Sequence, residues 1–203
     1  MRDWWLRTFL VLQRPRPVFV ALRDDSKQSL GDRSEPVLAI VLLVGIAGVL
    51  STTTAGRLLE DNDYDGLLVA VWAFIAGGIY GAFGYFAVGA LLYAGCKALG
   101  SQGTYRRARH VLAFACVPIA LSLVLWPVKL AVFGEDVFRR GGSDSGAGGA
   151  VFAGLTYAFV AWAVVLLVIG VRAVHGWTWQ RALGACGLAV AMPIVIGLVL
   201  RSF

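Results

Sequence analysis

Five long apolar blocks with almost no charge decide what this chain of 203 residues can fold into. They cover about residues 36–55, 67–96, 110–129, 150–171 and 182–200. About 20 apolar residues in an α-helix cross the hydrocarbon core of a bilayer, so each block can span. Hydrophobic residues make up 59% of the chain and charged residues 15%, against about half and a quarter in soluble domains. The sequence predicts an all-α polytopic membrane helix bundle with five transmembrane helices, over residues 35–203.

The second block runs uncharged from residue 66 to residue 96, which is longer than a bilayer requires. We expect it to tilt, to extend beyond the membrane, or to bend near residues 77 and 78. Small residues recur along one of its faces, and in lipid such residues let helix backbones approach closely. These residues are Gly77, Gly81, Gly84 and Gly89. Helix packing is favoured over the alternative, a narrow pore lined by glycine backbone, because only Tyr80 and Tyr85 add polar groups there.

The distribution of Lys and Arg predicts the orientation in the membrane, because loops on the cytoplasmic side carry an excess of them. Thirteen of the 18 lie before the first block, between the second and third, or between the fourth and fifth. With five spans, these three segments share one side. We therefore expect a cytoplasmic N-terminus and an outer C-terminus. The outer segment over residues 139–149 is interpreted as a flexible connector.

Residues 1–34 are interpreted as a cytoplasmic segment and not as a domain. Trp4, Trp5 and Phe9 belong to a broad apolar surface, which predicts an amphipathic helix in the membrane interface with the tryptophans at headgroup depth. Two prolines, Pro15 and Pro17, end this helix. A short apolar piece and a polar linker over residues 23–33 follow. The first span then opens at residues 34–36, with a serine cap and a proline in the first turn. The segment does not match a secretory signal peptide.

Enzyme activity, cofactors and metal ions are not expected. The middle of every apolar block lacks ionisable residues, which usually mark proton or ion pathways. Motifs such as HExxH and GxSxG are absent, as is a glycine-rich phosphate loop. The three cysteines, Cys96, Cys116 and Cys186, have no metal-ligand spacing and are interpreted as small buried hydrophobes.

A basic and aromatic cytoplasmic face is the candidate binding site. Its residues are Lys97, Tyr105, Arg106, Arg107, Arg109, His110, Arg172, His175 and Arg181. Each cation near an anionic leaflet contributes on the order of 1 kcal/mol of binding. The face is therefore expected to bind anionic lipid headgroups or a partner membrane protein, and no nucleic acid. The alternative is that these charges only set the topology.

The third and fourth blocks carry a pattern of residues that resembles the Yip1 domain family. An aromatic-basic pair, Tyr105 and Arg106, opens the third block, and Pro118 lies in its middle. The fourth block and the loop after it add Trp162, Leu166, Gly170, Val171, His175 and Thr178, and the N-terminal segment adds Leu12, Pro15 and Phe19. The resemblance implies a five-span bundle with a cytoplasmic N-terminus, of the compact bacterial type in the plasma membrane. In eukaryotic relatives a longer cytosolic N-terminal region contacts small GTPases during vesicle trafficking. That role is not implied here, because the segment is short and has no Asp-Leu-Tyr-Gly-Pro motif.

Three functional hypotheses remain open. The first is a non-enzymatic protein that organises membrane through its basic face. The second is a translocator of lipids or small solutes, because Pro118 should leave the Phe114 carbonyl without its usual helical donor. The third is an accessory subunit of a larger membrane complex. The glycine faces fit contacts within one bundle or between two copies.

Overall fold

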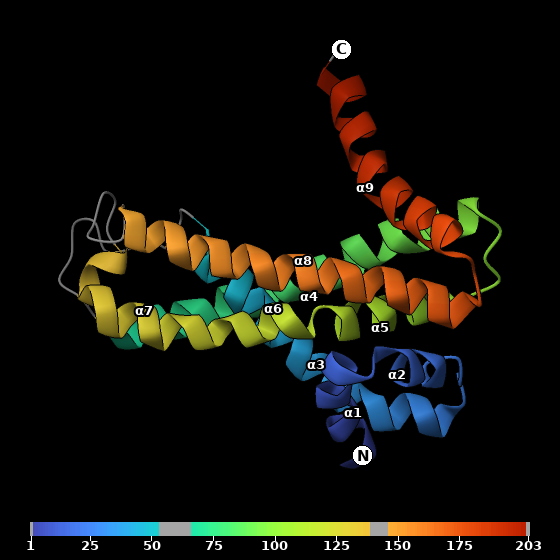
Figure 1. The fold of residues 1–203 in the computed structure, drawn as a ribbon, viewed down its shortest axis with the longest axis horizontal. Helices are drawn as coiled ribbons and strands as arrows, with labels where there is room; N and C mark the ends of the chain where they lie inside the picture. The colour runs from blue at the N-terminus through green and yellow to red at the C-terminus, as the bar shows by residue number, and fades with distance from the viewer. Residues whose placement is uncertain (1, 53–65, 139–145, 202–203) are drawn as a thin grey trace.

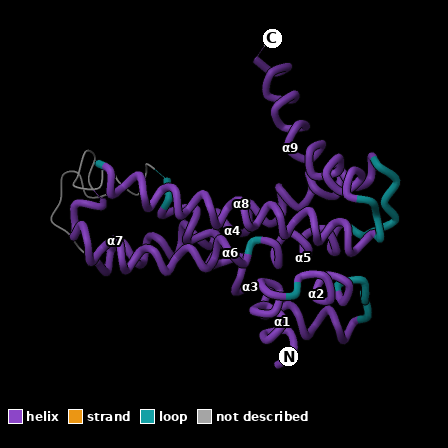
Figure 2. The backbone as a smooth tube through the Cα atoms, in the orientation of Figure 1, coloured by secondary structure: helices purple, strands orange, loops and turns teal. Residues whose placement is uncertain are grey.

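The computed structural model describes residues 2–52, 66–138 and 146–201 of the chain. Every regular element in this part is helical (Figure 2). The elements are α1 (Arg2–Gln13), α2 (Pro15–Ala21), α3 (Lys27–Leu50), α4 (Gly66–Ala98), α5 (Tyr105–Ala115), α6 (Val117–Leu121), η2 (Ser122–Val124), α7 (Leu125–Phe133), η3 (Gly134–Phe138), α8 (Ala147–His175) and α9 (Trp179–Arg201). The predicted all-α class is confirmed for these residues. The expected end of the first span at residues 53–55 and most of the 139–149 connector lie outside them.

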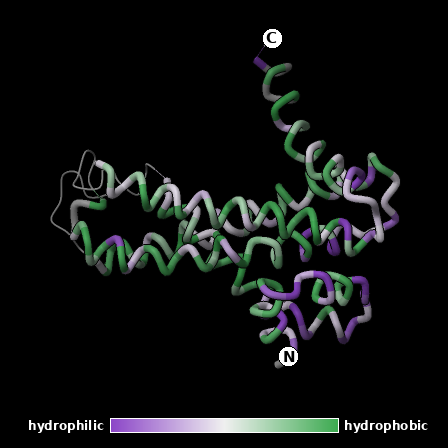
Figure 3. The backbone as a smooth tube through the Cα atoms, viewed as in Figure 1, coloured by the Kyte–Doolittle hydropathy of each residue, from purple (hydrophilic) through white to green (hydrophobic). Residues whose placement is uncertain are grey.

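Four helical segments are long and apolar enough to cross a membrane: α3, α4, the run Tyr105–Phe133 that joins α5 to α7, and α8. The apolar part of α9 over Trp179–Val195 is shorter than these four. Apolar residues dominate the long helices, and hydrophilic residues gather near the N-terminal helices and at the connections beside them (Figure 3). The chain is therefore an integral membrane protein of helical type.

Helix α3 begins at Lys27, well before the start near Pro36 that the sequence suggests. The hydroxyl of Ser26 accepts a hydrogen bond from the backbone N–H of Ser29 at 3.3 Å, which is the geometry of an N-cap. Pro36 therefore lies inside the helix, and it is buried. The expected polar linker over residues 23–33 is reduced to a short turn before Ser26, because the rest of it is helical.

Helices α3 and α4 cross closely, and glycines make the contact. A Cβ atom on Gly45 would lie 1.9 Å from the carbonyl oxygen of Gly77, and one on Gly81 would lie 2.2 Å from that of Val41. The backbones themselves are thus in contact, as small residues permit in membrane bundles. Gly84 was expected in the same packing face but does not take part in this close contact, because a Cβ atom there would meet nothing within 4 Å.

The third span is interrupted near its middle, at Cys116. Helix α5 ends at Ala115, Cys116 forms a turn, and α6 begins at Val117 with Pro118 in its first turn. A proline is well accommodated there, because the first helical N–H groups have no intrahelical acceptor. The sequence predicted a bend at Pro118 within one continuous helix. Instead, the helix stops for one residue before Pro118 and starts again (Figure 1).

The N-terminal helices α1 and α2 pack against the bundle. Trp4 lies 5.6 Å from Phe114 between ring centroids, and Phe19 is fully buried. A Cβ atom on Gly170 of α8 would approach the Phe19 ring to 2.9 Å, so Gly170 makes room for it. Trp4, which the sequence placed in the membrane interface, is thus buried within the protein together with Phe19, because both fill the space beside α5 and α8.

Helix α9 packs on the bundle through its first half. Ala182, Ala185 and Ala189 are buried there, and a Cβ atom on Gly95 of α4 would lie 2.4 Å from the Ala185 carbonyl oxygen. Beyond these alanines, α9 diverges from α4 and α8 (Figure 1). Residues on the diverging half, including Val190 and Ile194, are exposed.

Candidate functional site

Three connections, over residues 22–26, 99–104 and 176–178, lie at the same end of the bundle (Figure 2). We call this region, with the helix ends that it joins, the basic end. Hydrophilic residues concentrate there (Figure 3). The three segments that the sequence assigned to one side by their Lys and Arg residues are therefore brought together in space.

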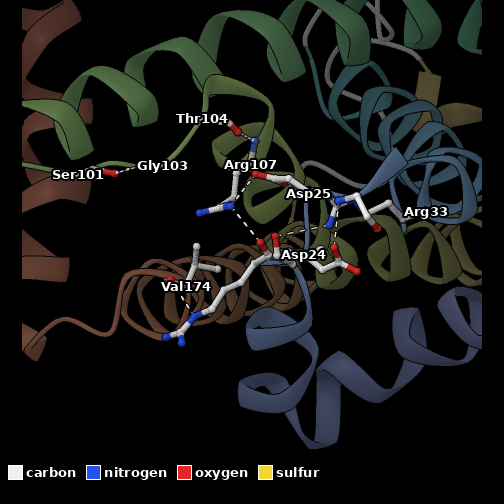
Figure 4. A network of polar contacts seen from close by, with 11 residues as sticks. Asp24, Asp25, Arg33, Ser101, Gly103, Thr104, Arg107 and Val174 are labelled. Carbon is white, nitrogen blue, oxygen red and sulfur yellow. Dashed lines mark hydrogen bonds and ion pairs between the residues drawn. The ribbon is translucent and has the colours of Figure 1, made fainter. Parts of the chain in front are cut away.

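The carboxylate of Asp25 binds two arginines at the basic end (Figure 4). Its Oδ2 atom lies 2.5 Å from Nη2 of Arg107 on α5, and its Oδ1 atom lies 3.2 Å from Nη2 of Arg33 on α3. The Arg33 side chain is 0% exposed, so its charge is removed from solvent. A buried guanidinium requires a paired anion, because desolvating an isolated charge is costly. Asp25 supplies that anion.

Arg23, in the same turn, binds the C-terminal end of α8. Its Nε atom donates to the carbonyl of Val174 at 3.0 Å and its Nη2 atom to that of Ala173 at 2.5 Å. The last carbonyls of a helix lack intrahelical donors and carry the negative end of the helix dipole, so a guanidinium satisfies both needs. The carbonyl of Arg23 in turn accepts a hydrogen bond from Arg107 at 2.9 Å. The turn thus joins α5 and α8.

Two side-chain caps shape the backbone around these ion pairs. Asp24 accepts a hydrogen bond from the backbone N–H of Ser26 at 2.9 Å, and that bond holds the pKa of Asp24 below its ordinary value. Thr104 accepts one from the backbone N–H of Arg107 at 3.2 Å and caps α5. Arg107 therefore sits in the first turn of α5, at a position fixed by the cap.

Arg181 and His175 both contact the ring of Trp177. The Arg181 guanidinium lies 4.5 Å from the Trp177 ring centroid, and the His175 ring stacks on it at 4.5 Å. Arg181 also donates to the carbonyl of Leu99 through Nε at 3.0 Å and through Nη2. The Nδ1 atom of His175 lies 2.9 Å from the Val171 carbonyl oxygen. These contacts join the two interhelical connections to each other.

Arg109 lies against three aromatic rings. Its guanidinium carbon is 5.0 Å from the ring centroid of Tyr85, 4.5 Å from that of Phe86 and 4.5 Å from that of Tyr105. The Tyr105 hydroxyl donates to the backbone carbonyl of Phe86 at 2.7 Å, which fixes the Tyr105 ring. A Cβ atom on Gly89 would lie 2.4 Å from Cγ of Arg109, so the glycine lets this side chain pass across α4.

The remaining basic residues of the candidate face are less constrained. Lys97 and Arg106 are exposed, and Lys97 lies 5.6 Å from the ring of Tyr93. Among the described residues, none forms a hydrogen bond or an ion pair with Arg106. Arg172 lies over the ring of Trp179 at 4.5 Å. His110, expected on the face, is instead 7% exposed, and no described residue forms a hydrogen bond with its Nδ1 atom.

A groove of about 290 Å³ lies on the bundle between α3, α4 and the broken third span. Its lining is almost entirely apolar and includes Val44, Gly81, Gly84, Tyr85, Leu112 and Cys116. Tyr85 is shared between this groove and the rings around Arg109. Arg109, Leu112 and Cys116 follow one another at helical spacing, so Arg109 lies at one end of the groove.

The residues that connect the basic end were not predicted from the sequence as part of the site: Arg23, Asp25 and Arg33. They were assigned to a polar linker, and the one signal was the adjacent pair of acids, Asp24 and Asp25, directly after Arg23. No group of three or more His, Cys, Asp or Glu residues within the described ranges is arranged to hold a metal ion.

Comparison with known protein families identifies a domain family that matches the chain. The model of the Yip1 domain matches residues 9–200, which is nearly the whole chain. No curated protein and no solved structure matches the chain.

Proposed function

The chain belongs to the Yip1 domain family, and on that premise we propose that it is a non-enzymatic membrane protein that binds anionic lipid headgroups through its basic end. In this proposal the basic end is cytoplasmic and holds headgroups of the inner leaflet of the plasma membrane. Binding there would organise the surrounding lipid or recruit a partner membrane protein.

One observation carries the proposal: two cations at the basic end, Lys97 and Arg106, are exposed, whereas Asp25 pairs with other arginines inside the protein. The arginines that share Asp25 are Arg33 and Arg107. Positive charge near an anionic leaflet is worth on the order of 1 kcal/mol per residue. Lipid phosphates and acidic headgroups are the natural partners of such a surface.

The N-terminal helix supports a location at the membrane surface. One side of α1 packs on the bundle through Trp4, and the other exposes Trp5, Leu6 and Phe9. Leu6 is 68% exposed and Phe9 is 63% exposed. Apolar side chains next to a basic surface are typical of helices that lie in the interface. We propose that this side of α1 enters the headgroup region and that α9 crosses as the fifth span.

Native mass spectrometry in nanodiscs that contain phosphatidylglycerol tests the proposal. The double variant Lys97→Gln/Arg106→Gln should lose about 2 kcal/mol of binding, or roughly 30-fold, for the most tightly retained anionic lipid. Lys129→Gln, a change on α7 away from the basic end, is the control and should retain that lipid. Equal retention by the double variant and the wild type would refute the proposal.

A second candidate function is lipid translocation. It is favoured by the apolar groove beside a span that is interrupted at Cys116. A fluorescent phospholipid in reconstituted liposomes should then become fully accessible to dithionite, and a trace that stops at half quenching would exclude translocation of that lipid.

A third candidate is an accessory subunit, favoured by the exposed apolar half of α9. Purification in mild detergent should then yield a stoichiometric partner, or a second copy of the chain.

A further inference from the structure

We infer that Arg109 and the apolar groove beside it form a site for one phospholipid, with the phosphate on the Arg109 guanidinium and one acyl chain in the groove. This deepens the proposed function by naming a single bound ligand. It needs a phosphate but no net negative headgroup, so a zwitterionic phospholipid satisfies it. The two proposals can therefore fail separately.

The headgroup end of the site is built around an arginine without an anion. Arg109 has five N–H donors, and no carboxylate or carbonyl among the described residues accepts from them. The rings of Tyr85, Phe86 and Tyr105 hold the guanidinium in place through cation–π contacts. A planar guanidinium that is already ordered can bind phosphate bidentately at a small entropic cost.

The chain end of the site is apolar and open at the side. The groove continues from Tyr85 past Leu112 to Cys116, where the third span is interrupted. Cys116 is seven positions after Arg109, which corresponds to about 10 Å along a helix. Phe83 on its wall is 71% exposed, as expected for a groove that opens toward the bilayer. An acyl chain matches both the polarity and the elongated shape.

Gly84 is the residue that keeps the groove empty of protein. It lines the groove, and a Cβ atom there would meet nothing within 4 Å. The absence of a side chain is therefore unexplained by helix packing, unlike at Gly77 and Gly81. A leucine at this position would occupy the space that the inference assigns to the chain. Gly154 on α8 is a matched control, because a Cβ atom there also meets nothing within 4 Å.

The test uses the full chain in nanodiscs of phosphatidylcholine alone, with native mass spectrometry of retained lipids. The wild type should keep one phosphatidylcholine molecule, and Gly84→Leu and Arg109→Gln should each lower its occupancy at least tenfold. Gly154→Leu should keep it. Equal retention by Gly84→Leu and Gly154→Leu would overturn the inference. Loss in Gly84→Leu with full retention in Arg109→Gln would overturn the assignment of the phosphate.

Two further measurements use the wild type, so they do not depend on the folding of a variant. A phosphatidylcholine with a photoreactive group on one chain should form adducts on residues 112–116 and 41–45. Adducts spread evenly over α8 would overturn the site.

Diacylglycerol, which has the chains without the phosphate, should be retained at least tenfold less. Equal retention of the two lipids would overturn the role of Arg109. If Lys97→Gln/Arg106→Gln loses anionic lipid and keeps phosphatidylcholine, the result supports the proposed function of the basic end and leaves the Arg109 site intact.

Discussion

The carboxylate of Asp25 lies 2.5 Å from the guanidinium of Arg107, which is 82 residues further along the chain. This ion pair joins the turn between α2 and α3 to the first turn of α5. The same carboxylate faces the buried Arg33 at 3.2 Å. One anion between two cations therefore connects α3, α5 and the turn before α3 at the basic end.

Replacing Asp25 by asparagine should destabilise the protein. The change keeps the shape but removes the anion, so the Arg33 charge stays buried without compensation. Removing one partner of a fully buried pair costs about 3–5 kcal/mol. We expect about 2 kcal/mol here, because Asp25 is 29% exposed. This corresponds to a fall of roughly 4–8 °C in melting temperature. Thermal unfolding in detergent measures it.

Asp24→Asn is the matched control for this change. Asp24 is exposed, and its hydrogen bond goes to the backbone of Ser26, which an asparagine oxygen also accepts. The melting temperature should hardly change. Equal effects of the two substitutions would show that net charge, and not the ion pair of Asp25, determines stability.

A second substitution should rescue Asp25→Asn. Replacing Arg33 by methionine removes the buried charge that has lost its anion, and methionine is unbranched and adapts to the space. Buried ion pairs are often replaced by apolar residues without loss of stability. Arg107 remains unpaired, but it is 22% exposed and stays partly solvated. The double variant should therefore regain about 1 kcal/mol or more. A double variant less stable than Asp25→Asn contradicts this account.

Gly45→Ala tests the crossing of α3 and α4. The added methyl group would lie 1.9 Å from the Gly77 carbonyl oxygen, so the two backbones would have to separate. Such overpacking costs about 1–3 kcal/mol. Gly78→Ala is the control, because its nearest atom would be Leu42 Cδ1 at 3.8 Å. Alanine there should be neutral or stabilise by up to about 1 kcal/mol through helix propensity. Thermal unfolding of both variants in one detergent compares them, and equal melting temperatures would contradict the crossing.

The helical class and the close packing at residues 77–81 follow from local sequence, because apolar length and small residues are strong signals in a membrane chain. The start of α3 does not follow from local sequence, because a proline in the first turn of a helix and a proline inside a helix give the same sequence pattern. The serine at residue 34 was a plausible cap, but Ser26 is the cap in the structure. The break at Cys116 could not be predicted either, since a proline is equally consistent with a bent helix and with a helix that stops and starts again.

The site was predictable in its location and not in its connections. Counting Lys and Arg brought the right segments together, but it treated all cations as equivalent. Arg107 binds Asp25, Arg181 binds a backbone carbonyl, and Arg106 is exposed. Such differences depend on contacts between residues that are distant in the chain, and a single sequence does not contain them. The burial of Trp4 and Phe19 was missed for the same reason.

Cysteine labelling tests the proposed orientation. In a variant with Cys96, Cys116 and Cys186 replaced by alanine, Thr52→Cys should react with a membrane-impermeant maleimide in intact cells. Gln102→Cys should react only after the cells are opened. Both residues are exposed, and they lie at opposite ends of the bundle. The reverse pattern would place the basic end outside and contradict the cytoplasmic assignment.

The fifth span is tested at the C-terminus. Helix α9 has 23 residues, which corresponds to about 34 Å, enough to cross a hydrocarbon core of about 30 Å. If it crosses, alkaline phosphatase fused after residue 203 should be active and green fluorescent protein at the same place should be dark. Phosphatase fused after Gly100, in a connection of the basic end, should be inactive. An inactive phosphatase and a fluorescent protein at the C-terminus would leave four spans, with both ends of the chain on the cytoplasmic side.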